Sequence, residues 1–204
     1  MARPKNRDSY HHGHLKRALV DGAIQLITEG GIDHFTMAKA ARAAGVSSGA
    51  PYRHFPDRHT LLVHVAREGA ELLDDAVDEA MGQASLDPAE QLLALGEAHV
   101  RFALERPAYY RVMHAPEYQP VDDDDDGDDA EEPAAEEGPT EVEANAETLA
   151  AAADGHREDA VRLAAQAMIY GLSRMLVDGH FPEGRDPEEA AAAMRQMLKA
   201  LVRR

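Results

Sequence analysis

Residues 36–55 read TMAKAARAAGVSSGAPYRHF, and this stretch decides the fold. Thr36 is a good helix N-cap because its hydroxyl can accept a hydrogen bond from a free first-turn N–H. Small apolar residues follow at helical spacing, and Gly45 comes where a left-handed C-terminal residue costs least. Ser48 can cap a second helix, with Pro51 in its first turn where a missing N–H does no harm. Helix, glycine turn and helix together predict a helix-turn-helix.

The exposed side chains of this predicted pair suit a nucleic-acid partner. In a helix-turn-helix the N-terminal residues of the second helix meet base edges in the major groove, while the first helix crosses the phosphate backbone. Small residues at the leading end permit close approach, and the serines can bond phosphates or bases. Larger polar groups that can hold phosphates flank them. The predicted DNA contacts are Thr36, Lys39, Ser47, Ser48, Gly49, Ala50, Tyr52, His54 and Arg58.

Each of these residues has an ordinary structural alternative, since Tyr52 or His54 alone could be a half-buried packing residue. Together they are more specific. Residues 10–73 resemble the DNA-binding domain of the TetR family of bacterial transcriptional regulators, through GG at 30–31, FTM at 35–37, ARAAGVS at 41–47, YRHFPDR at 52–58 and LL at 61–62. The resemblance implies that Tyr52, His54, Thr36 and Arg58 hold phosphates, and that Ser48, Gly49 and Ala50 face bases.

Composition sets further bounds. The 204 residues suffice for one large or two small domains. Aromatic residues make up only 5% and tryptophan is absent, while Ala, Leu, Glu and Arg are abundant, so we predict an all-α fold. The sequence has no cysteine, no secretory leader pattern and no apolar run of about 20 residues. We therefore expect a cytoplasmic protein that does not cross a membrane.

Little in the sequence supports an enzyme. It has no glycine-rich phosphate loop, no cysteine nucleophile and no His-Glu-x-x-His motif, so we predict no catalytic residues and no cofactor. His11, His12 and His14 invite a metal interpretation, but Gly13 disrupts the i,i+4 pairing and no carboxylate lies close. We predict no metal site, because a solvated helix start near DNA explains these histidines better.

Charge is unevenly distributed along the chain. The net charge is −17, yet residues 1–70 hold ten Lys and Arg against six Asp and Glu. The predicted DNA-binding end is therefore basic, and it opens with a short arm, Arg3, Lys5 and Arg7, that can lie along phosphates.

The acidic residues gather in one segment. Residues 121–147 hold fourteen acids and no base. Like charges repel, and few apolar groups offset the ordering entropy, so we predict a disordered loop at about 120–145. Two hypotheses for its function are a weak divalent-cation sink and an electrostatic brake that competes with DNA for the basic end.

Helix start and stop signals organise the rest of the chain. The first predicted helix is apolar on one face, at Leu15, Leu19, Ala23, Leu26 and Ile27. Residues 1–57 form the predicted three-helix DNA-binding domain, extended by a connecting helix over 58–80 that Asp57 caps. A boundary falls at 86–88 because a residue before proline avoids helical geometry. Residues 86–204 form a predicted regulatory and dimerisation domain, with helices at 88–105, from 107, at 147–153, at 158–177 and from 187 onward.

Part of this second domain resembles one TetR subgroup, named for a Trp, His and Gly signature. The resemblance lies in FALERP at 102–107 and YRVM at 110–113. At the signature position, 166–172, the sequence reads QAMIYGL, so that Gln166 stands for the tryptophan and Tyr170 for the histidine. Only Gly171 is retained, and no ligand identity is carried over.

The last two predicted helices are apolar on more than one side, which suits a partner chain. The family resemblance implies a homodimer in which these helices pack against their copies. Two recognition helices about 34 Å apart would enter successive major grooves, so we expect a near-palindromic double-stranded operator.

A small-molecule effector is the other expected partner. Polar and apolar groups of the second domain could line a pocket. The candidates are His99, Phe102, Tyr109, Met113, Met168, Tyr170 and Met175, although each could simply fill the core. The resemblance implies a repressor that its ligand releases from DNA. The ligand would favour a dimer state in which the two helix-turn-helix motifs are wrongly spaced for the operator. An activator or a metal-responsive regulator of the same fold is the alternative.

Overall fold

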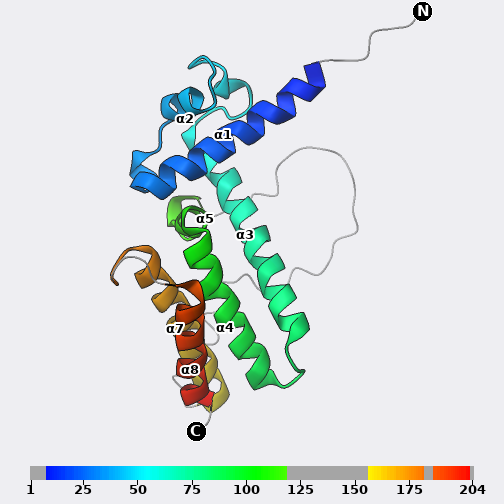
Figure 1. Ribbon diagram of the computed structural model, residues 1–204, viewed down its shortest axis with the longest axis vertical. Coiled ribbons are helices and arrows are strands. Elements are labelled where there is room, and N and C mark those ends of the chain that lie inside the picture. The colour runs from blue at the N-terminus through cyan, green and yellow to red at the C-terminus, as the bar shows by residue number, and fades with distance from the viewer. Residues whose placement is uncertain (1–7, 119–155, 182–185, 203–204) are drawn as a thin grey trace, which may run out of the picture. The chain divides into compact units, whose positions relative to one another are not determined.

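The computed structural model describes residues 8–118, 156–181 and 186–202, and every regular element in these ranges is a helix (Figure 1). Contacts divide the chain into two compact units. The first comprises Met1–Asp74 and Arg106–Val121, and the second comprises Asp75–Glu105 and Asp122–Arg204. The predicted domain boundary near residue 86 stays a prediction; the division by contacts falls within one long helix, and the described residues 106–118 group with the N-terminal unit. None of the described helices combines the length and hydropathy needed to span a bilayer.

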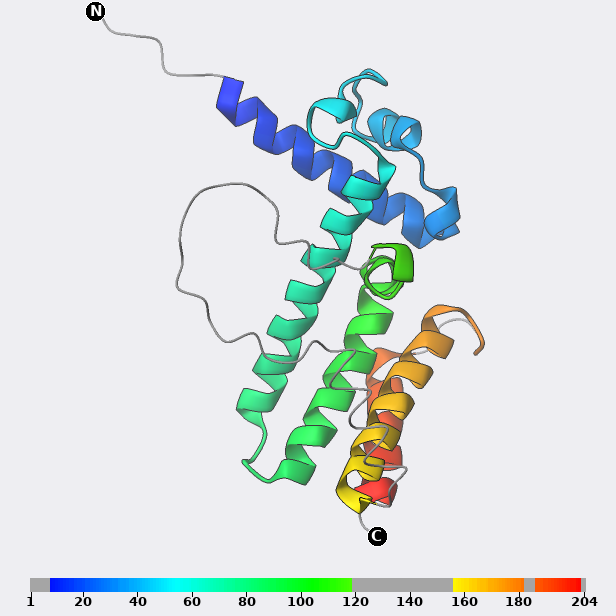
Figure 2. The same ribbon diagram turned by 180° about the vertical axis from the view of Figure 1, so that it is seen from behind.

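The first unit is built around α1 (Asp8–Gly30), α2 (Met37–Ala43) and the first part of α3 (Arg58–Gln83). Three 3-10 turns, η1 (Ile32–His34), η2 (Pro51–Arg53) and η3 (Pro116–Tyr118), and the short helix α5 (Pro107–Met113) complete it. α1 and α2 lie side by side in Figure 1 and Figure 2. Their fully or nearly fully buried residues include Leu19, Val20, Ala23, Ile27, Met37, Ala40 and Ala41.

Local capping explains where α2 and α3 begin and end. Thr36 Oγ1 accepts a hydrogen bond from the Lys39 amide at 3.2 Å, and Asp57 Oδ1 accepts one from the Thr60 amide at 2.7 Å. At the end of α2, Gly45 has φ +69°, its amide donates to the Arg42 carbonyl, and the Val46 amide donates to the Ala41 carbonyl. This pair of bonds is a Schellman motif, which requires a left-handed residue and so favours glycine. The predicted caps at Thr36, Gly45 and Asp57 are confirmed.

The second unit contains α4 (Pro88–Glu105), α7 (Arg157–Val177) and α8 (Pro187–Val202), which contact one another (Figure 1, Figure 2). Its core comprises Leu93, Val100, Ala165, Ile169, Ala190, Met194 and Leu198. Gly96 lets α4 approach α8 closely, because a Cβ at that position would lie 2.5 Å from Leu198 Cδ1.

The starts of α4 and α8 follow the predicted proline pattern. Asp87 Oδ1 accepts from the Ala89 amide at 2.9 Å, and Asp186 Oδ1 accepts from the Glu188 amide at 3.1 Å. Each aspartate precedes a proline that begins the helix, where no N–H is needed. The predicted helix at 147–153 and the predicted acidic loop lie outside the described residues.

Candidate nucleic-acid interface

The second element of the helix-turn-helix differs from the prediction. We expected a helix capped by Ser48, but residues 48–50 form a turn and only Pro51–Arg53 are helical, as a single 3-10 turn without a side-chain cap. The turn closes through the Ala50 amide and the Ser47 carbonyl at 3.0 Å, and the Phe55 amide reaches the Pro51 carbonyl at 3.0 Å. Serine and glycine are weak helix formers, and 3-10 geometry is used in short pieces, so this stretch stops at one turn.

Two buried side chains anchor η2 to the rest of the first unit. Pro51 is buried and Phe55 is 2% exposed, with the Phe55 ring 5.5 Å from the His64 ring and 5.7 Å from Lys16 Nζ. The side chains between them face solvent: Tyr52 is 55% exposed and Arg53 is exposed. Anchors on either side of outward-facing polar groups give the arrangement that a DNA-reading element needs.

Around η2, several predicted contacts reach the surface. Ser47, Ser48 and Gly49 are exposed, and Ala50 and His54 are partly exposed. From α2, Thr36 is exposed while it caps the helix, and Lys39 is half-buried with its Nζ donating to the His34 carbonyl at 2.8 Å. Eight of the nine predicted DNA contacts are thus at least partly exposed in the first unit.

Arg58 is the exception. Its side chain is partly buried, and it donates to the Ile32 carbonyl at 3.0 Å, to the Phe35 carbonyl at 3.4 Å and to the Tyr118 hydroxyl. A guanidinium with three acceptors inside the protein is engaged away from solvent, so we withdraw Arg58 from the set of phosphate contacts. Its partners lie 23 to 60 residues away in sequence, which no local pattern reveals.

Two exposed cations were missed by the sequence reasoning. Arg42 lies in the last turn of α2 and Arg53 lies in η2, and both are exposed. Among the described residues neither guanidinium has a hydrogen-bond or ion-pair partner, which leaves both groups available to phosphates. The sequence feature that could have identified these two arginines is their position close to the small residues Ala41 and Pro51, on elements already expected to face DNA.

A second polar cluster lies inside the first unit. Glu68 Oε1 accepts hydrogen bonds from Arg17 Nη1 at 2.6 Å and from the Tyr109 hydroxyl at 2.7 Å, and so connects α1, α3 and α5. Burial acts to raise the pKa of Glu68, but these two hydrogen bonds outweigh it and hold that pKa below its usual value. Burial, with the hydrogen bond to Glu68, raises the pKa of Tyr109 to about 12.

The seven predicted ligand residues are divided between the two units. Tyr109 and Met113 lie in the first unit, where both pack on Gly69, and Tyr109 is committed to Glu68. The other five lie in the second unit: Phe102 is 3% exposed, His99 and Met168 are partly buried, and Tyr170 and Met175 are 42% and 44% exposed. One shared pocket for these seven residues therefore stays a prediction.

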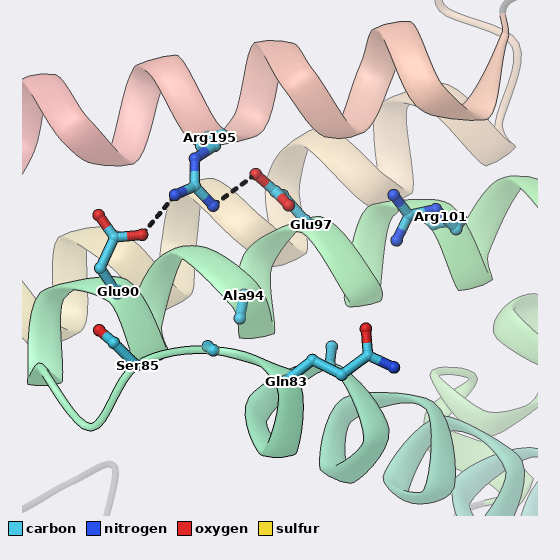
Figure 3. A pocket seen from close by; sticks show the side chains of 9 residues that line it. Gln83, Ser85, Glu90, Ala94, Glu97, Arg101 and Arg195 are labelled. Atoms are coloured by element: carbon cyan, nitrogen blue, oxygen red, sulfur yellow. Dashed lines mark hydrogen bonds and ion pairs between the residues drawn. The ribbon is translucent and has the colours of Figure 1, made fainter.

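A cavity of about 540 Å³ does lie in the second unit, lined by other residues (Figure 3). Arg195 of α8 projects over α4, where its guanidinium donates to Glu97 at 3.0 Å and to Glu90. Arg101 also lines the cavity and forms a bidentate ion pair with Glu188, at 2.8 and 2.9 Å. Gln83, Ser85 and three alanines complete the lining. In the described ranges no three His, Asp or Glu side chains come together as a metal site.

Two family models match the N-terminal and C-terminal regions of the chain. Residues 19–65 match the family described as bacterial regulatory proteins, tetR family, and residues 92–201 match the tetracyclin repressor-like, C-terminal domain. The HTH-type transcriptional regulator BetI of Cronobacter sakazakii is 36% identical over 87 residues, which are 41% of this chain and 42% of that protein. The chain thus spans about two fifths of the length of this curated relative.

Solved structures share the fold over nearly the whole chain. A Rhodococcus protein of unknown function is 26% identical, with 94% of this chain and 97% of that chain covered and a TM-score of 0.59. A TetR family regulator from Marinobacter aquaeolei is 19% identical, with 92% and 97% covered and a TM-score of 0.55. AibR, solved with isovaleryl coenzyme A and operator DNA, is 17% identical, with 90% and 97% covered and a TM-score of 0.56.

The matched families and named relatives are transcriptional regulators rather than enzymes. The subgroup named for Trp, His and Gly stays a prediction. The C-terminal match alone covers more than half of the chain, and the N-terminal match covers the helix-turn-helix. The chain belongs to the TetR family of DNA-binding bacterial transcriptional regulators.

Proposed function

We propose that this protein is a ligand-responsive repressor that binds a near-palindromic operator as a homodimer in the cytoplasm. The observation that carries the proposal is the outward-facing segment of the helix-turn-helix, in which Pro51 and Phe55 are buried while Ser47, Ser48, Tyr52 and Arg53 face solvent. Ser48, Gly49 and Ala50 can approach base edges closely because they are small. Thr36, Lys39, Tyr52 and His54, joined by Arg42 and Arg53, supply phosphate contacts.

Exposed apolar residues on the last two helices support the homodimer. Tyr170 and Met175 of α7 and Met197 of α8 are between 41% and 44% exposed. Alanines at 167, 192, 193 and 200 are also exposed on these helices, beside the exposed Gln166 and Gln196. Such faces suit close packing against a second copy, and a two-fold dimer matches a two-fold operator. Tyr170→Arg should give a monomer by sedimentation velocity, and a dimer that survives this change would refute α7 as interface.

The cavity beside Arg195 supports a small-molecule effector. It is an open pocket of about 540 Å³ with a mostly polar and charged lining, so an effector held there should be polar and pair with its arginine, glutamate and amide groups. AibR, which shares the fold, was solved with isovaleryl coenzyme A. We propose that the effector binds in the second unit and releases the operator, which requires different affinities for the two DNA-binding states.

The decisive experiment is DNA binding by fluorescence anisotropy. The labelled probe is the duplex immediately upstream of the protein's own gene, compared with a scrambled duplex across a salt series. We expect specific, saturable binding to the upstream duplex, weakened by Tyr52→Ala and with a steep negative salt slope. Equal weak binding to both duplexes would contradict an operator at this position, and a genomic fragment selection that also yields nothing would refute the proposal.

A further inference from the structure

Tyr118 lies far from the helix-turn-helix in sequence, yet it contacts that motif's framework. It ends η3, is 5% exposed, and its hydroxyl accepts a hydrogen bond from Arg58 Nη1. The Tyr118 ring centroid is 5.7 Å from the Arg58 guanidinium carbon and 5.7 Å from the His59 ring. Since Arg58 begins α3, the segment that follows α5 is tied to the first turn of α3 within the first unit.

The other donors of Arg58 hold the segment that leads into α2. Nη2 donates to the Ile32 carbonyl in η1, and Nε donates to the Phe35 carbonyl directly before the Thr36 cap. The guanidinium also lies 5.9 Å from the centre of the buried Phe35 ring. Loop carbonyls need hydrogen-bond partners, and hydrogen bonds from a charged donor are stronger than neutral ones. Arg58 thereby fixes the start of α2 relative to α3.

We propose that Tyr118 is a positioning residue for DNA binding. Its hydroxyl is the third acceptor that orients the planar guanidinium of Arg58, and through Arg58 it sets the position of α2 and its following turn. Without that acceptor the guanidinium gains alternative orientations, and the Ile32 and Phe35 carbonyls lose a fixed donor. The inference rests on the proposed function, in that α2 and η2 read DNA, but its structural step can be tested without DNA.

The DNA-free test is hydrogen exchange on the full-length protein and two hydroxyl-deletion variants. Tyr118→Phe should speed amide exchange about tenfold in residues 36–43, the loss expected for one hydrogen bond to a charged group, while exchange in α4 stays unchanged. Tyr109→Phe is the matched control, because it removes a hydroxyl of the same chain segment that bonds Glu68 rather than Arg58. Unchanged exchange in residues 36–43 of Tyr118→Phe, or equal acceleration there in Tyr109→Phe, would overturn the proposal.

The DNA test uses the upstream duplex and the salt series described above. Tyr118→Phe should weaken specific binding about tenfold with an unchanged salt slope, because no cation–phosphate contact is removed. Arg58→Gln also removes the donors to the Ile32 and Phe35 carbonyls, so it should weaken specific binding at least as much, again with an unchanged salt slope. Adding Tyr118→Phe to Arg58→Gln should cause no further loss.

Two results of this DNA test would overturn the positioning role. They are additive losses in the double variant, or a salt slope that Arg58→Gln reduces by about 0.9 per protomer, as loss of a phosphate contact would do. Absence of specific binding by the unmodified protein would instead refute the proposed function, and the exchange experiment alone would then decide whether Tyr118 fixes α2.

Discussion

The turn between α2 and η2 depends on one backbone conformation, and Gly45→Ala tests it. Gly45 has φ +69°, and a Cβ added there would meet nothing within 4 Å, so the substitution introduces conformational strain without a clash. A left-handed L-residue costs about 1–2 kcal/mol, and the stiffer unfolded chain returns about 0.4–1 kcal/mol. The expected net loss is about 1 kcal/mol, which corresponds to a Tm lower by about 2–4 °C for a chain of this size.

Gly49→Ala is the matched control for this experiment. Gly49 lies four residues further along in the same unit and also has open space around its Cα, but its φ is not in the left-handed region. Alanine there should leave stability unchanged or raise it by about 0.4–1 kcal/mol through the unfolded state. Thermal unfolding followed by circular dichroism at 222 nm measures both variants. A Gly45→Ala protein as stable as the unmodified chain, or as stable as Gly49→Ala, would refute the strained-turn reasoning.

Three further predictions follow from the geometry. Replacing Arg42 and Arg53 by glutamine should each make the salt slope of DNA binding shallower by about 0.9 per protomer, and an unchanged slope would remove that arginine from the interface. Because the pKa of Tyr109 is raised from 10.0 to about 12, the neutral phenol stabilises the fold fully below pH 10, and this stabilisation is lost as the pH rises through about 12. Absorbance at 295 nm should therefore show a late-ionising component that is missing from Tyr109→Phe, and identical titration curves would contradict the Glu68 hydrogen bond. Ser173 is fully buried, and its hydroxyl has no hydrogen-bond partner among the described residues, so Ser173→Ala should raise stability by about 1 kcal/mol. A lower Tm for Ser173→Ala would show that the hydroxyl is satisfied in the functional protein.

Features set by near neighbours in sequence could be predicted. Thr36, Asp57 and Asp186 bond amides two or three residues away, and Gly45 needs only its own backbone angle. Such interactions depend on residue type and spacing, which the sequence displays directly. The starts of α2, α3 and α8 followed from them.

Features set by distant neighbours could not be predicted. Arg58 was assigned to phosphates, although its guanidinium partner Tyr118 lies 60 residues away. Tyr109 was assigned to a ligand pocket, although its partner Glu68 lies 41 residues away in another helix. Helical periodicity shows which face of a helix is apolar but does not show which element covers it, so periodicity alone could not assign the seven ligand candidates to one site.

The second helix of the helix-turn-helix was predicted too long for a different reason. A cap residue and a proline allow a helix to begin, whereas the length of the helix depends on the helix propensities of the residues in that segment. Ser47, Ser48 and Gly49 contribute little helix stability, and only Pro51–Arg53 form a 3-10 turn.

Hydroxyl-radical footprinting of the upstream duplex tests the central claim most directly, because it shows where a dimer of these helix-turn-helix motifs lies on DNA. The account expects two protected segments related by two-fold symmetry, with centres about 10 base pairs or a multiple of one helical turn apart, and protection that is lost with Tyr52→Ala. A single unpaired segment, or protection that persists unchanged in Tyr52→Ala, would contradict it.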